Sequence, residues 1–433
     1  MTLRIGLLGA GNRGIGAYGT HLLTQPRRAR IVAVAEPRPE RLLHAGELHD
    51  VPAGELFAST EAFWEAAPGL GLDAVIIATP DETHHAQVLR AAELGVPMLL
   101  EKPVANSLGQ LLDLRERLRD YRSPIVVAHV LRYTLFFRTL KRLLDEGRIG
   151  DLVHLNHTEN VGYWHFAHSF VRGNWRREGT SSPMVLAKSC HDLDILRWFA
   201  GAPLRTLGAF GGLHHFSREH APEGSTEFCL DGCAVEASCP YSARKIYLER
   251  FGAERGWKGW PNNVLTLDTT PAGVRAALEK GPYGRCVYRC DNDVFDTYSI
   301  NLLFGNGVSA AFSLTAFTEV NTRTLHLVGS HGEVHGHMEK GEIIVQDFRT
   351  RTREVIDVSD VDASDGHGGG DRALVLNFLD LLEDYVRGER RSSPTAFQES
   401  LESHIIAFHA HGAAKDAQLR PPEVEPHRAE ART

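Results

Sequence analysis

The chain has 433 residues, of which 42% are hydrophobic and 24% charged, and its formal net charge at pH 7 is −8. This length and composition predict a globular protein of two or three domains. The acidic balance argues against nucleic acid or an anionic membrane as a partner. Because we find no signal-peptide pattern and no apolar run of membrane-spanning length, we expect a cytoplasmic protein.

The first expected element is a short apolar strand that runs directly into a glycine-rich turn. Residues 5–8 are Ile-Gly-Leu-Leu, and Gly9, Gly11 and Gly14 follow in the spacing G-x-G-x-x-G. In such a turn the first glycine permits the bend, the second lets the backbone approach a pyrophosphate, and the third lets helix and strand pack closely. The helix that starts there offers unpaired N–H groups to phosphate. The pattern therefore predicts a dinucleotide-binding turn.

The second strand supports this interpretation. Residues 30–35 form an apolar run that is followed by Glu36. A carboxylate about 20 residues after the glycine turn is where a Rossmann fold binds the ribose hydroxyls of NAD. Because a carboxylate repels the 2′-phosphate of NADP, Glu36 favours NAD, although Arg38 nearby leaves room for NADP.

Strand-like runs alternate with helical patterns through the first 130 residues, which is typical of a doubly wound parallel sheet. We expect strands at 3–8, 30–35, 74–78, 96–100 and 125–128, and helices at 82–94 and 108–118. Ligands bind outside the carboxyl ends of the strands in such sheets. Those ends carry the glycine turn, Glu36, Thr79-Pro80-Asp81 and Glu101-Lys102-Pro103, so we expect these groups to line one crevice.

After about residue 130 the pattern changes to strands with few long helices between them. We expect helices at 136–146, 374–382 and 400–413, strands at 152–157, 299–303, 310–314 and 324–328, and a hairpin turn at Phe304-Gly-Asn-Gly307. The predicted fold is α/β, with an N-terminal Rossmann doubly wound parallel sheet and a C-terminal α/β domain that has an open, largely antiparallel sheet. The predicted boundaries are 1–128 for the dinucleotide-binding domain, 129–420 for the substrate-binding and oligomerisation domain, and 421–433 for a disordered tail.

Two groups are candidates for proton transfer. Lys102 lies at the mouth of the expected crevice, where desolvation lowers a lysine pKa towards neutrality, so it could exchange a proton with a substrate hydroxyl. Alternatively, it pairs with Glu101 or with a cofactor hydroxyl. If residues 186–198 form one helix, Lys188, His191 and Trp198 share a face, and Lys188 and His191 could form a proton-transfer pair. The alternative is that His191 is a structural histidine.

The segment 163–175 is unusually rich in aromatic residues and histidine. Tryptophan offers an apolar face to a sugar ring, while histidine and arginine offer hydrogen bonds or positive charge. The candidate substrate-binding residues are Tyr163, Trp164, His165, His168, Arg172 and Trp175. The alternative is that Trp164, Phe166 and Phe170 simply belong to the core.

All six cysteines follow residue 189, and Cys229, Cys233 and Cys239 lie close together in the sequence. The gap between the first two fits zinc ligands, and Cys286 or Cys290 could supply a fourth thiolate. A structural zinc site is one interpretation, and buried free thiols in a reducing compartment are the other. Farther along, the glycine-rich segment 366–371 either brings His367 or Asp371 over the site or is a plain linker.

Together these motifs resemble the Gfo/Idh/MocA family of NAD(P)-dependent oxidoreductases. The resemblance rests on residues 9–14, Ala78-Thr-Pro-Asp-Glu-Thr-His84, Glu101-Lys-Pro103, Asp145-Glu-Gly-Arg-Ile-Gly150 and His191-Asp-Leu-Asp194. It implies oxidation of a sugar or cyclitol hydroxyl with NAD, and an open sheet that mediates a homodimer or homotetramer. Carried over by motif, Lys102 is the catalytic lysine and His191 works beside the substrate. The expected cofactor contacts are Gly9, Gly11, Asn12, Arg13, Gly14, Glu36, Thr79, Pro80, His84, Glu101 and Lys102.

The sequence departs from the family pattern at one position. The family usually has an aspartate four residues before the histidine, whereas this chain has Ala187, followed by Lys188. Our leading hypothesis is an NAD-dependent oxidoreductase in which Lys188 binds or polarises a carbohydrate substrate. The resemblance also allows an NAD-dependent glycosidase, which oxidises a ring hydroxyl transiently, eliminates the aglycone, adds water and returns the hydride. A third hypothesis is an NAD-binding sensor without turnover.

Overall fold

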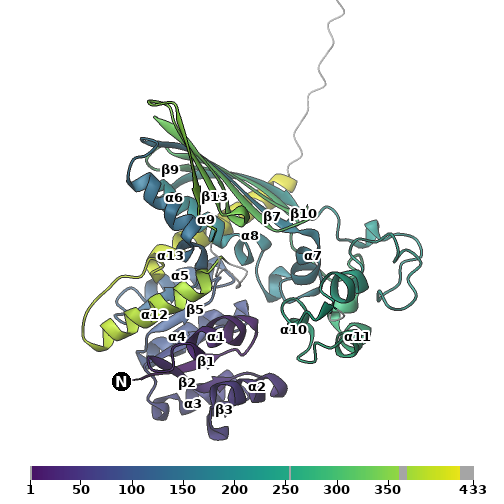
Figure 1. The fold of residues 1–433 in the computed structure, drawn as a ribbon. Coiled ribbons are helices and arrows are strands. Elements are labelled where there is room, and N and C mark those ends of the chain that lie inside the picture. Colours follow the sequence, from purple (N-terminus) through teal and green to yellow (C-terminus); the bar gives the residue numbers. More distant parts are fainter. Residues whose placement is uncertain (1, 253–254, 360–367, 420–433) are drawn as a thin grey trace, which may run out of the picture.

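The computed structural model describes residues 2–252, 255–359 and 368–419. Two β-sheets organise these residues, one from the N-terminal third of the chain and one from its later part (Figure 1). The predicted tail at 421–433 and His367 lie outside the described residues. Within those ranges, no helix is both long and apolar enough to cross a membrane.

The first sheet has six parallel strands in the order β3-β2-β1-β4-β5-β6. Its strands are β1 (Leu3–Leu8), β2 (Ala29–Ala35), β3 (Leu56–Phe57), β4 (Ala74–Ile77), β5 (Met98–Leu100) and β6 (Ile125–Val127). The strand order reverses between β1 and β4, and a sheet of this type binds a dinucleotide at that point. The predicted Rossmann sheet is thereby confirmed, and of its strands only the two-residue β3 was not predicted.

Helices cover the faces of this sheet. They include α2 (Pro39–His49), α3 (Thr60–Leu70), α4 (His84–Leu94) and α5 (Leu108–Arg117). The hydroxyls of Ser59 and Ser107 cap the first turns of α3 and α5 by accepting backbone N–H groups. A later helix, α12 (Gly370–Val386), also packs here, because Leu374 and Phe378 share a core with the strands of the first sheet. The predicted domain boundary at residue 128 assigns α12 to the second domain, so it does not anticipate that the chain returns to the first sheet.

The second sheet has eight strands in the order β14-β13-β12-β11-β7-β10-β9-β8. They are β7 (Leu152–Gly162), β8 (Leu204–Gly212), β9 (Thr297–Phe304), β10 (Ser309–Thr318), β11 (Thr322–Gly329), β12 (Gly332–His337), β13 (Glu342–Asp347) and β14 (Thr352–Asp357). All neighbours are antiparallel except β7 and β10, which are parallel. The predicted open, largely antiparallel sheet is confirmed, and so is the hairpin turn after Phe304, where Gly307 has φ +91°.

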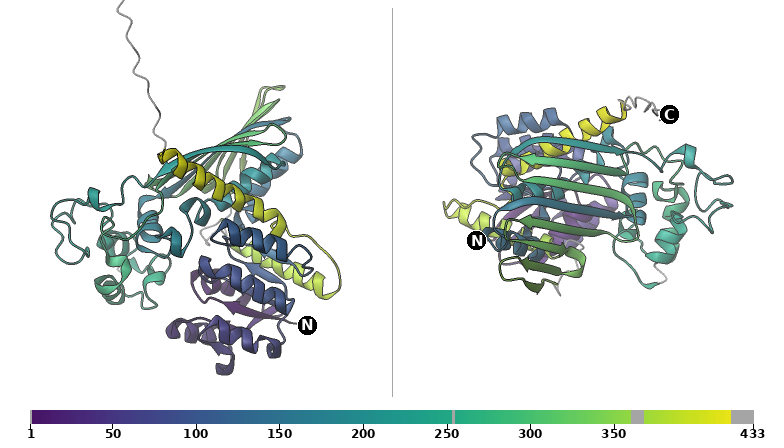
Figure 2. Two further views of the ribbon diagram at one scale, coloured as in Figure 1. Left: turned by 180° about the vertical axis from the view of Figure 1, so that it is seen from behind. Right: turned by 90° about the horizontal axis from the view of Figure 1, so that it is seen from above.

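One face of the second sheet is covered by α6 (Leu135–Asp145), α9 (Cys190–Ala200) and α13 (Phe397–Leu419), whereas no described helix covers the other face (Figure 2). The condition of a single helix over 186–198 is not met. A short helix, α8 (Met184–Ala187), ends before Lys188, and α9 begins two residues later. Lys188 and His191 therefore do not share the face of one helix.

Between β8 and β9 the chain leaves the sheet and forms a lobe at one side of the molecule, which we call the insertion lobe (residues 213–296; Figure 1). It contains only short helices, among them α10 (Asn262–Leu265) and α11 (Pro271–Lys280). Asn263 donates a hydrogen bond to Oδ1 of Asn12 at 3.4 Å, and Arg41 donates to the carbonyl of Asn263 at 3.0 Å. The insertion lobe therefore contacts the first sheet beside the glycine turn.

Candidate active site

The glycine turn joins β1 to a π-helical segment, Asn12–Gly19. Gly9 has φ +92°, and a Cβ there would lie 2.4 Å from the carbonyl oxygen of Ala78. A Cβ on Gly14 would lie 1.9 Å from the carbonyl oxygen of Gly9. At Gly11 a Cβ would meet only the Arg38 guanidinium, at 3.8 Å. The packing of the protein thus explains two glycines, while Gly11 leaves open space where a pyrophosphate could approach the backbone.

Glu36 ends β2 next to this turn and is 2% exposed. Its Oε2 accepts the N–H of Ala10 at 2.9 Å, and its Oε1 pairs with Nε of Arg38 at 2.6 Å. Burial alone would raise the pKa of Glu36, but the hydrogen bonds from Arg38 and Ala10 outweigh it, so the pKa is lowered. The carboxylate is therefore charged and lies where the fold binds a ribose. Arg38 also lies near Gly11, over the same part of the crevice.

Arg13 connects the glycine turn to two other elements. Its Nε lies 2.5 Å from Oε1 of Glu101 at the end of β5, and its two terminal nitrogens bind Asp371 of α12 at 2.6 and 3.0 Å. Tyr18 donates a further hydrogen bond to Glu101. Both carboxylates are almost fully buried. The Arg13 side chain thus fixes the turn, and any contact from Arg13 to a cofactor would come from its backbone.

Lys102 follows β5 and extends from the first sheet to α8. Its Nζ donates a hydrogen bond to the carbonyl oxygen of Ala187 at 2.6 Å, and its backbone N–H donates to Glu101 at 3.0 Å. Two residues farther on, the N–H of Val104 donates to Nε2 of His404 in α13 at 3.0 Å. The loop that carries Lys102 is therefore held at both ends.

The loop after β4 is tied to this same loop. The ring of His84 lies between the two, with Nδ1 2.6 Å from the carbonyl oxygen of Pro103 and Nε2 2.9 Å from that of Thr79. Asp81 accepts hydrogen bonds from Trp175 at 3.2 Å and Ser182 at 3.0 Å, both from the later part of the chain. His84 and Trp175 thus position backbone around the crevice, with Thr79 and Pro80 at its edge.

A buried cluster of charges lies on the helix-covered face of the second sheet. Nζ of Lys188 is 3.4 Å from Oε1 of Glu159, and Arg323 pairs with both Glu159 and Asp192, the latter at 2.8 Å. His157 donates to Asp192 at 2.6 Å. All five residues except Lys188, whose side chain is 17% exposed, are almost completely buried. Lys188 is therefore the member of the cluster that reaches open space.

The surroundings of the cluster shift the pKa values of its two carboxyl groups, Glu159 and Asp192, in opposite directions. Burial raises the pKa of Glu159 to about 7, against the opposing effect of Arg323 and Lys188. Burial also lowers the pKa of Lys188. Burial alone would raise the pKa of Asp192, but Arg323 and His157 hold it below its usual range. Glu159 can consequently gain or lose a proton near neutral pH, whereas Asp192 remains ionised.

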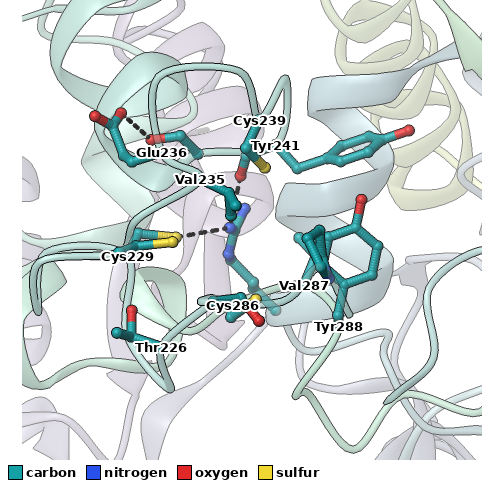
Figure 3. Close-up of a pocket in the computed structure, with 14 residues that line it drawn as sticks. Thr226, Cys229, Val235, Glu236, Cys239, Tyr241, Cys286, Val287 and Tyr288 are labelled. Atoms are coloured by element: carbon teal, nitrogen blue, oxygen red, sulfur yellow. Dashed lines mark hydrogen bonds between the residues drawn. The ribbon is translucent and has the colours of Figure 1, made fainter. Parts of the chain in front are cut away.

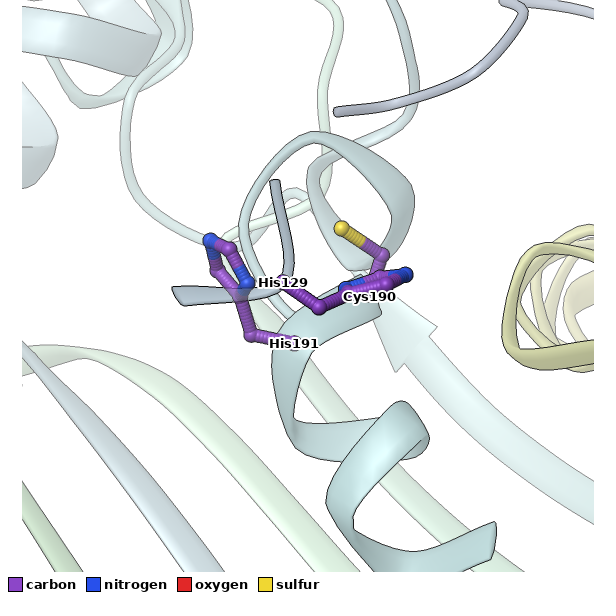
Figure 4. Close-up of side chains that lie close together, drawn as sticks. All are labelled: His129, Cys190 and His191. Carbon is purple, nitrogen blue, oxygen red and sulfur yellow. The ribbon is translucent and has the colours of Figure 1, made fainter. Parts of the chain in front are cut away.

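His191 lies at the start of α9, next to His129, which follows β6. Ligand atoms of His129, Cys190 and His191 all lie within 4.8 Å of one another, and all three residues are buried (Figure 4). Burial raises the pKa of the Cys190 thiol to about 12 and lowers that of His129. The group therefore places a neutral imidazole and a neutral thiol beside His191.

The aromatic segment 163–175 divides into two parts. Tyr163 and His165 are partly exposed, and Nδ1 of His165 donates to Oδ1 of Asn321 at 3.0 Å. Burial lowers the pKa of His165, and the charge of Lys188 lowers it further. The effect of Lys188 shows that this ring lies close to the charged cluster. Trp164 is buried and donates to the carbonyl of Glu319 at 3.1 Å. His165 thus lies near Lys188.

His168 and Arg172 lie in the interior, towards the insertion lobe. His168 donates to or accepts from the Tyr247 hydroxyl at 3.0 Å and stacks on Tyr283. Arg172 is 1% exposed, and its guanidinium donates to the carbonyls of Arg285 and Tyr241, both at 2.7 Å. These contacts favour a structural role for both residues.

Several residues of the site were not predicted from the sequence: His129, Glu159, Asp192, Arg323 and the ion pair of Asp371 with Arg13. One signal was available for Glu159. Leu155, His157, Glu159 and Val161 alternate along β7 and are all buried. A histidine and a carboxylate at the inward positions of an alternating strand indicate buried polar groups that need partners.

Two family descriptions match the chain. Residues 3–129 match an oxidoreductase family with an NAD-binding Rossmann fold, and residues 141–403 match the C-terminal alpha/beta domain of an oxidoreductase family. The Bacillus subtilis protein YteT is 24% identical over 343 residues, which cover 76% of this chain and 77% of that protein. An inositol 2-dehydrogenase of Streptomyces avermitilis is 33% identical over 224 residues, which cover 51% of this chain and 59% of the dehydrogenase.

Solved structures share the fold across almost the whole chain. A levoglucosan dehydrogenase in complex with NADH and levoglucosan has a TM-score of 0.67 at 16% identity, covering 96% of this chain and 98% of that one. An inositol dehydrogenase homolog from Azotobacter vinelandii, complexed with NAD⁺, also has a TM-score of 0.67, at 14% identity and with 96% of each chain covered. At these identities the likeness establishes the fold alone.

Proposed function

The chain belongs to the Gfo/Idh/MocA family of NAD-binding oxidoreductases, and from this premise we propose that it oxidises a hydroxyl group of a sugar or polyol to a carbonyl with NAD⁺, or reduces the carbonyl in the reverse reaction with NADH. The observation that carries the proposal is the position of Lys102. Its side chain follows a strand of the dinucleotide-binding sheet, and its Nζ lies 2.6 Å from the carbonyl oxygen of Ala187 at the end of α8. A proton-transferring group therefore lies where a cofactor and a substrate would meet.

The residues around the glycine turn fit NAD. Gly11 leaves space for the pyrophosphate, and the buried carboxylate of Glu36 lies where the ribose hydroxyls of the adenosine would bind. When bound, NAD supplies a nicotinamide that takes up or returns a hydride. Arg38 covers Glu36 in this structure and would have to release it for the ribose to bind. We infer that NAD is preferred over NADP because Glu36 is charged and buried.

Lys102 would take the proton of the reacting hydroxyl as the hydride leaves the same carbon. The carbonyl of Ala187 holds one N–H of this side chain, which orients Nζ, and the loop fixed by His404 prevents it from moving away. His191, at the start of α9, would hold the hydroxyl oxygen or share its proton. Because Ala187 replaces the usual carboxylate of the family, the proton path cannot use a side chain at that position.

Lys188 and Glu159 offer a different path. Lys188 follows Ala187 directly, and its Nζ contacts Glu159 at 3.4 Å. The pair can accept a proton near neutral pH because burial raises the pKa of Glu159 to about 7. Lys188 also offers hydrogen-bond donors to the hydroxyls of a carbohydrate, and Nε2 of the neutral His165 ring offers an acceptor. We therefore assign Lys188 to substrate binding, with Glu159 as its partner.

One assay separates the hypotheses. The purified full chain would be given NAD together with free sugars, inositols and aryl glycosides, and both NADH absorbance and aglycone release would be followed. NADH formation from a free sugar or inositol supports the proposal. Aglycone release that needs NAD but yields no net NADH would identify a glycosidase instead. Tight NAD binding with neither signal across a broad substrate panel would support a sensor.

We also infer a homodimer or homotetramer. The outer face of the second sheet carries no described helix (Figure 2), and it exposes Phe210 and Val355 to 64% and 50%. An uncovered sheet face with large apolar side chains is typical of a subunit interface. Light scattering after size exclusion would show a single chain mass if this inference is wrong.

A further inference from the structure

Four cysteines from two distant segments line one small cavity in the insertion lobe. Cys229, Cys233 and Cys239 belong to one irregular stretch, and Cys286 comes much later, yet all four line a cavity of about 20 Å³ (Figure 3). The sequence left the fourth member open between Cys286 and Cys290. The structure selects Cys286, because the thiol of Cys290 instead lies 3.3 Å from the carbonyl oxygen of Cys286 and does not line the cavity.

Backbone hydrogen bonds bring the two segments together. The N–H of Cys229 donates to the carbonyl of Gly284 at 2.9 Å, and the N–H of Cys286 donates to the carbonyl of Glu227 at 2.9 Å. These two bonds flank a short antiparallel bridge between Phe228 and Arg285, and Cys229 and Cys286 are the residues that follow the two bridge residues. The arrangement of the thiols is therefore a property of the backbone and not of side-chain rotation alone.

A buried cation lies against the same cavity. Arg172 lines it, and Nη2 of this residue lies 3.7 Å from Sγ of Cys229. The other terminal nitrogen, Nη1, is buried and has no hydrogen-bond partner among the described residues. No carboxylate in the described ranges pairs with Arg172, although a buried charge normally needs a counter-charge. Thiolates would supply this negative charge and accept the N–H groups.

We propose that Cys229, Cys233, Cys239 and Cys286 bind one thiophilic metal centre as thiolates, with Arg172 as the cation that balances their charge. The centre would join the two cysteine-bearing segments of the insertion lobe, which has only short helices of its own. Small irregular units of this kind commonly depend on a metal for stability. The same lobe contacts the glycine turn through Asn263, so the centre would also hold that contact in place.

The spacing of the sulfur atoms bears on the kind of centre. Because a Zn–S bond is about 2.3 Å long, four thiolates around one zinc ion have sulfur atoms about 3.8 Å apart. In the described part of the chain, no three of these sulfur atoms lie within 4.8 Å of one another. A single zinc ion would therefore draw the thiols inward, whereas an iron–sulfur cluster, also held by four cysteine thiolates, needs a wider spacing. Both share the same ligand chemistry, and metal analysis distinguishes them.

The first experiment measures the metal content of the full chain. The protein would be produced in medium that contains zinc and iron, purified without oxygen or chelators, and analysed for zinc, iron and inorganic sulfide. About one zinc per chain, or iron with matching sulfide and visible absorption, supports the proposal. Metal-free protein whose six thiols all react with a thiol reagent after unfolding, and whose melting temperature does not respond to added zinc, overturns it.

Variants then locate the metal. Cys239→Ser and Cys286→Ser should each lose most of the metal and lower the melting temperature by several degrees. The matched control Cys290→Ser should keep it, because this residue lies close by but outside the cavity. Cys190→Ser tests a different buried donor group, formed by His129, Cys190 and His191. Metal retained in both cavity variants, or lost only in Cys190→Ser, would place it elsewhere and refute the proposal. Should the cavity variants not fold, metal loss and destabilisation of the native chain with a chelator provide the same test.

Discussion

The Nζ atom of Lys102 lies 2.6 Å from the carbonyl oxygen of Ala187. One residue belongs to the dinucleotide-binding sheet, and the other ends α8 on the far side of the crevice. The hydrogen bond thus connects the loop after β5 directly to the end of α8. It also explains how the chain can lack a carboxylate at position 187, because the backbone there holds the lysine.

Lys102→Ala should abolish turnover while leaving NAD binding almost unchanged. Removal of a proton-transferring group lowers kcat by about 10²- to 10⁴-fold. The NAD dissociation constant should stay within about threefold, since the proposed cofactor contacts come from the glycine turn and Glu36. Steady-state kinetics and calorimetric titration check both parts. Lys280→Ala, at an exposed position of α11, is the matched control. If the two variants have equal kcat, Lys102 does not transfer the proton.

Glu159 should appear in the pH dependence of oxidation. Its pKa is raised to about 7, so the carboxyl group is mostly protonated below pH 7 and ionised above it. If the Lys188–Glu159 pair accepts the substrate proton, kcat/KM for oxidation rises as pH increases through 7. Glu159→Gln cannot titrate and should flatten this limb while lowering kcat/KM at pH 8. The two profiles, measured between pH 5.5 and 8.5, would be indistinguishable if Glu159 has only a structural role.

The first sheet could be predicted because its strands are continuous apolar runs and because the ligand-binding ends carry recognisable motifs. A parallel sheet covered on both faces requires such runs. The break between α8 and α9 could not be predicted, since neither glycine nor proline marks it. Lys188 nevertheless lies at the site, but it reaches there from a turn and not from the face of a helix.

The contacts that hold the site together were largely beyond the reach of the sequence. Arg13 and Asp371 are separated by 358 positions, and Arg323 and Glu159 by 164. No local pattern specifies such pairs, because Arg323 and Glu159 meet only when β11 pairs with β7, and Arg13 and Asp371 meet only when α12 packs against the first sheet. The cysteines are an intermediate case. Their spacing indicated three ligands, but only the backbone bridge between residues 228 and 285 identifies the fourth.

Cofactor preference should depend on Glu36 and Arg38 in opposite ways. Glu36→Ala should raise KM for NAD by roughly 10- to 100-fold, since hydrogen bonds to a charged group contribute about 1.5–3 kcal/mol. Arg38→Ala should lower KM for NAD, because the carboxylate no longer has to be released, and should further reduce the use of NADP. Kinetics with both cofactors test this, with exposed Glu40→Ala as control. A lower KM for NADP in Arg38→Ala would contradict the proposed role of Arg38.

Asp371 should contribute far more to stability than a carboxylate elsewhere on the same helix. It is 1% exposed and binds Arg13 through both oxygens. Breaking a buried ion pair costs about 3–5 kcal/mol, so Asp371→Ala should lower the free energy of unfolding by that amount. Asp380, also on α12, pairs with Arg28 but its side chain is 46% exposed, and Asp380→Ala should cost less than about 1 kcal/mol. If urea unfolding shows that the two variants lose similar free energies of unfolding, the ion pair with Arg13 is not what holds α12 in place.

The folded chain should lose stability in mild acid because of its buried histidines. Burial lowers the pKa of both His168 and His404 to about 3, whereas an unfolded histidine has a pKa of about 6.5. Between these values the unfolded chain binds protons that the folded chain cannot, so stability is complete above pH 6.5 and falls as pH decreases towards 3. Each histidine then costs about 1.4 kcal/mol per pH unit.

This dependence can be assigned to individual side chains. His168→Gln can still bond to the Tyr247 hydroxyl but does not titrate, so its unfolding free energy should fall less steeply, by about 1.4 kcal/mol per pH unit, between pH 6 and 4.5. His44→Gln, at an exposed position of α2, should leave the slope unchanged. Urea unfolding across this range measures both. If the slope in His168→Gln is unaltered, His168 can take up its proton in the folded chain. The packing of Tyr247 and Tyr283 around it would then have to loosen in acid.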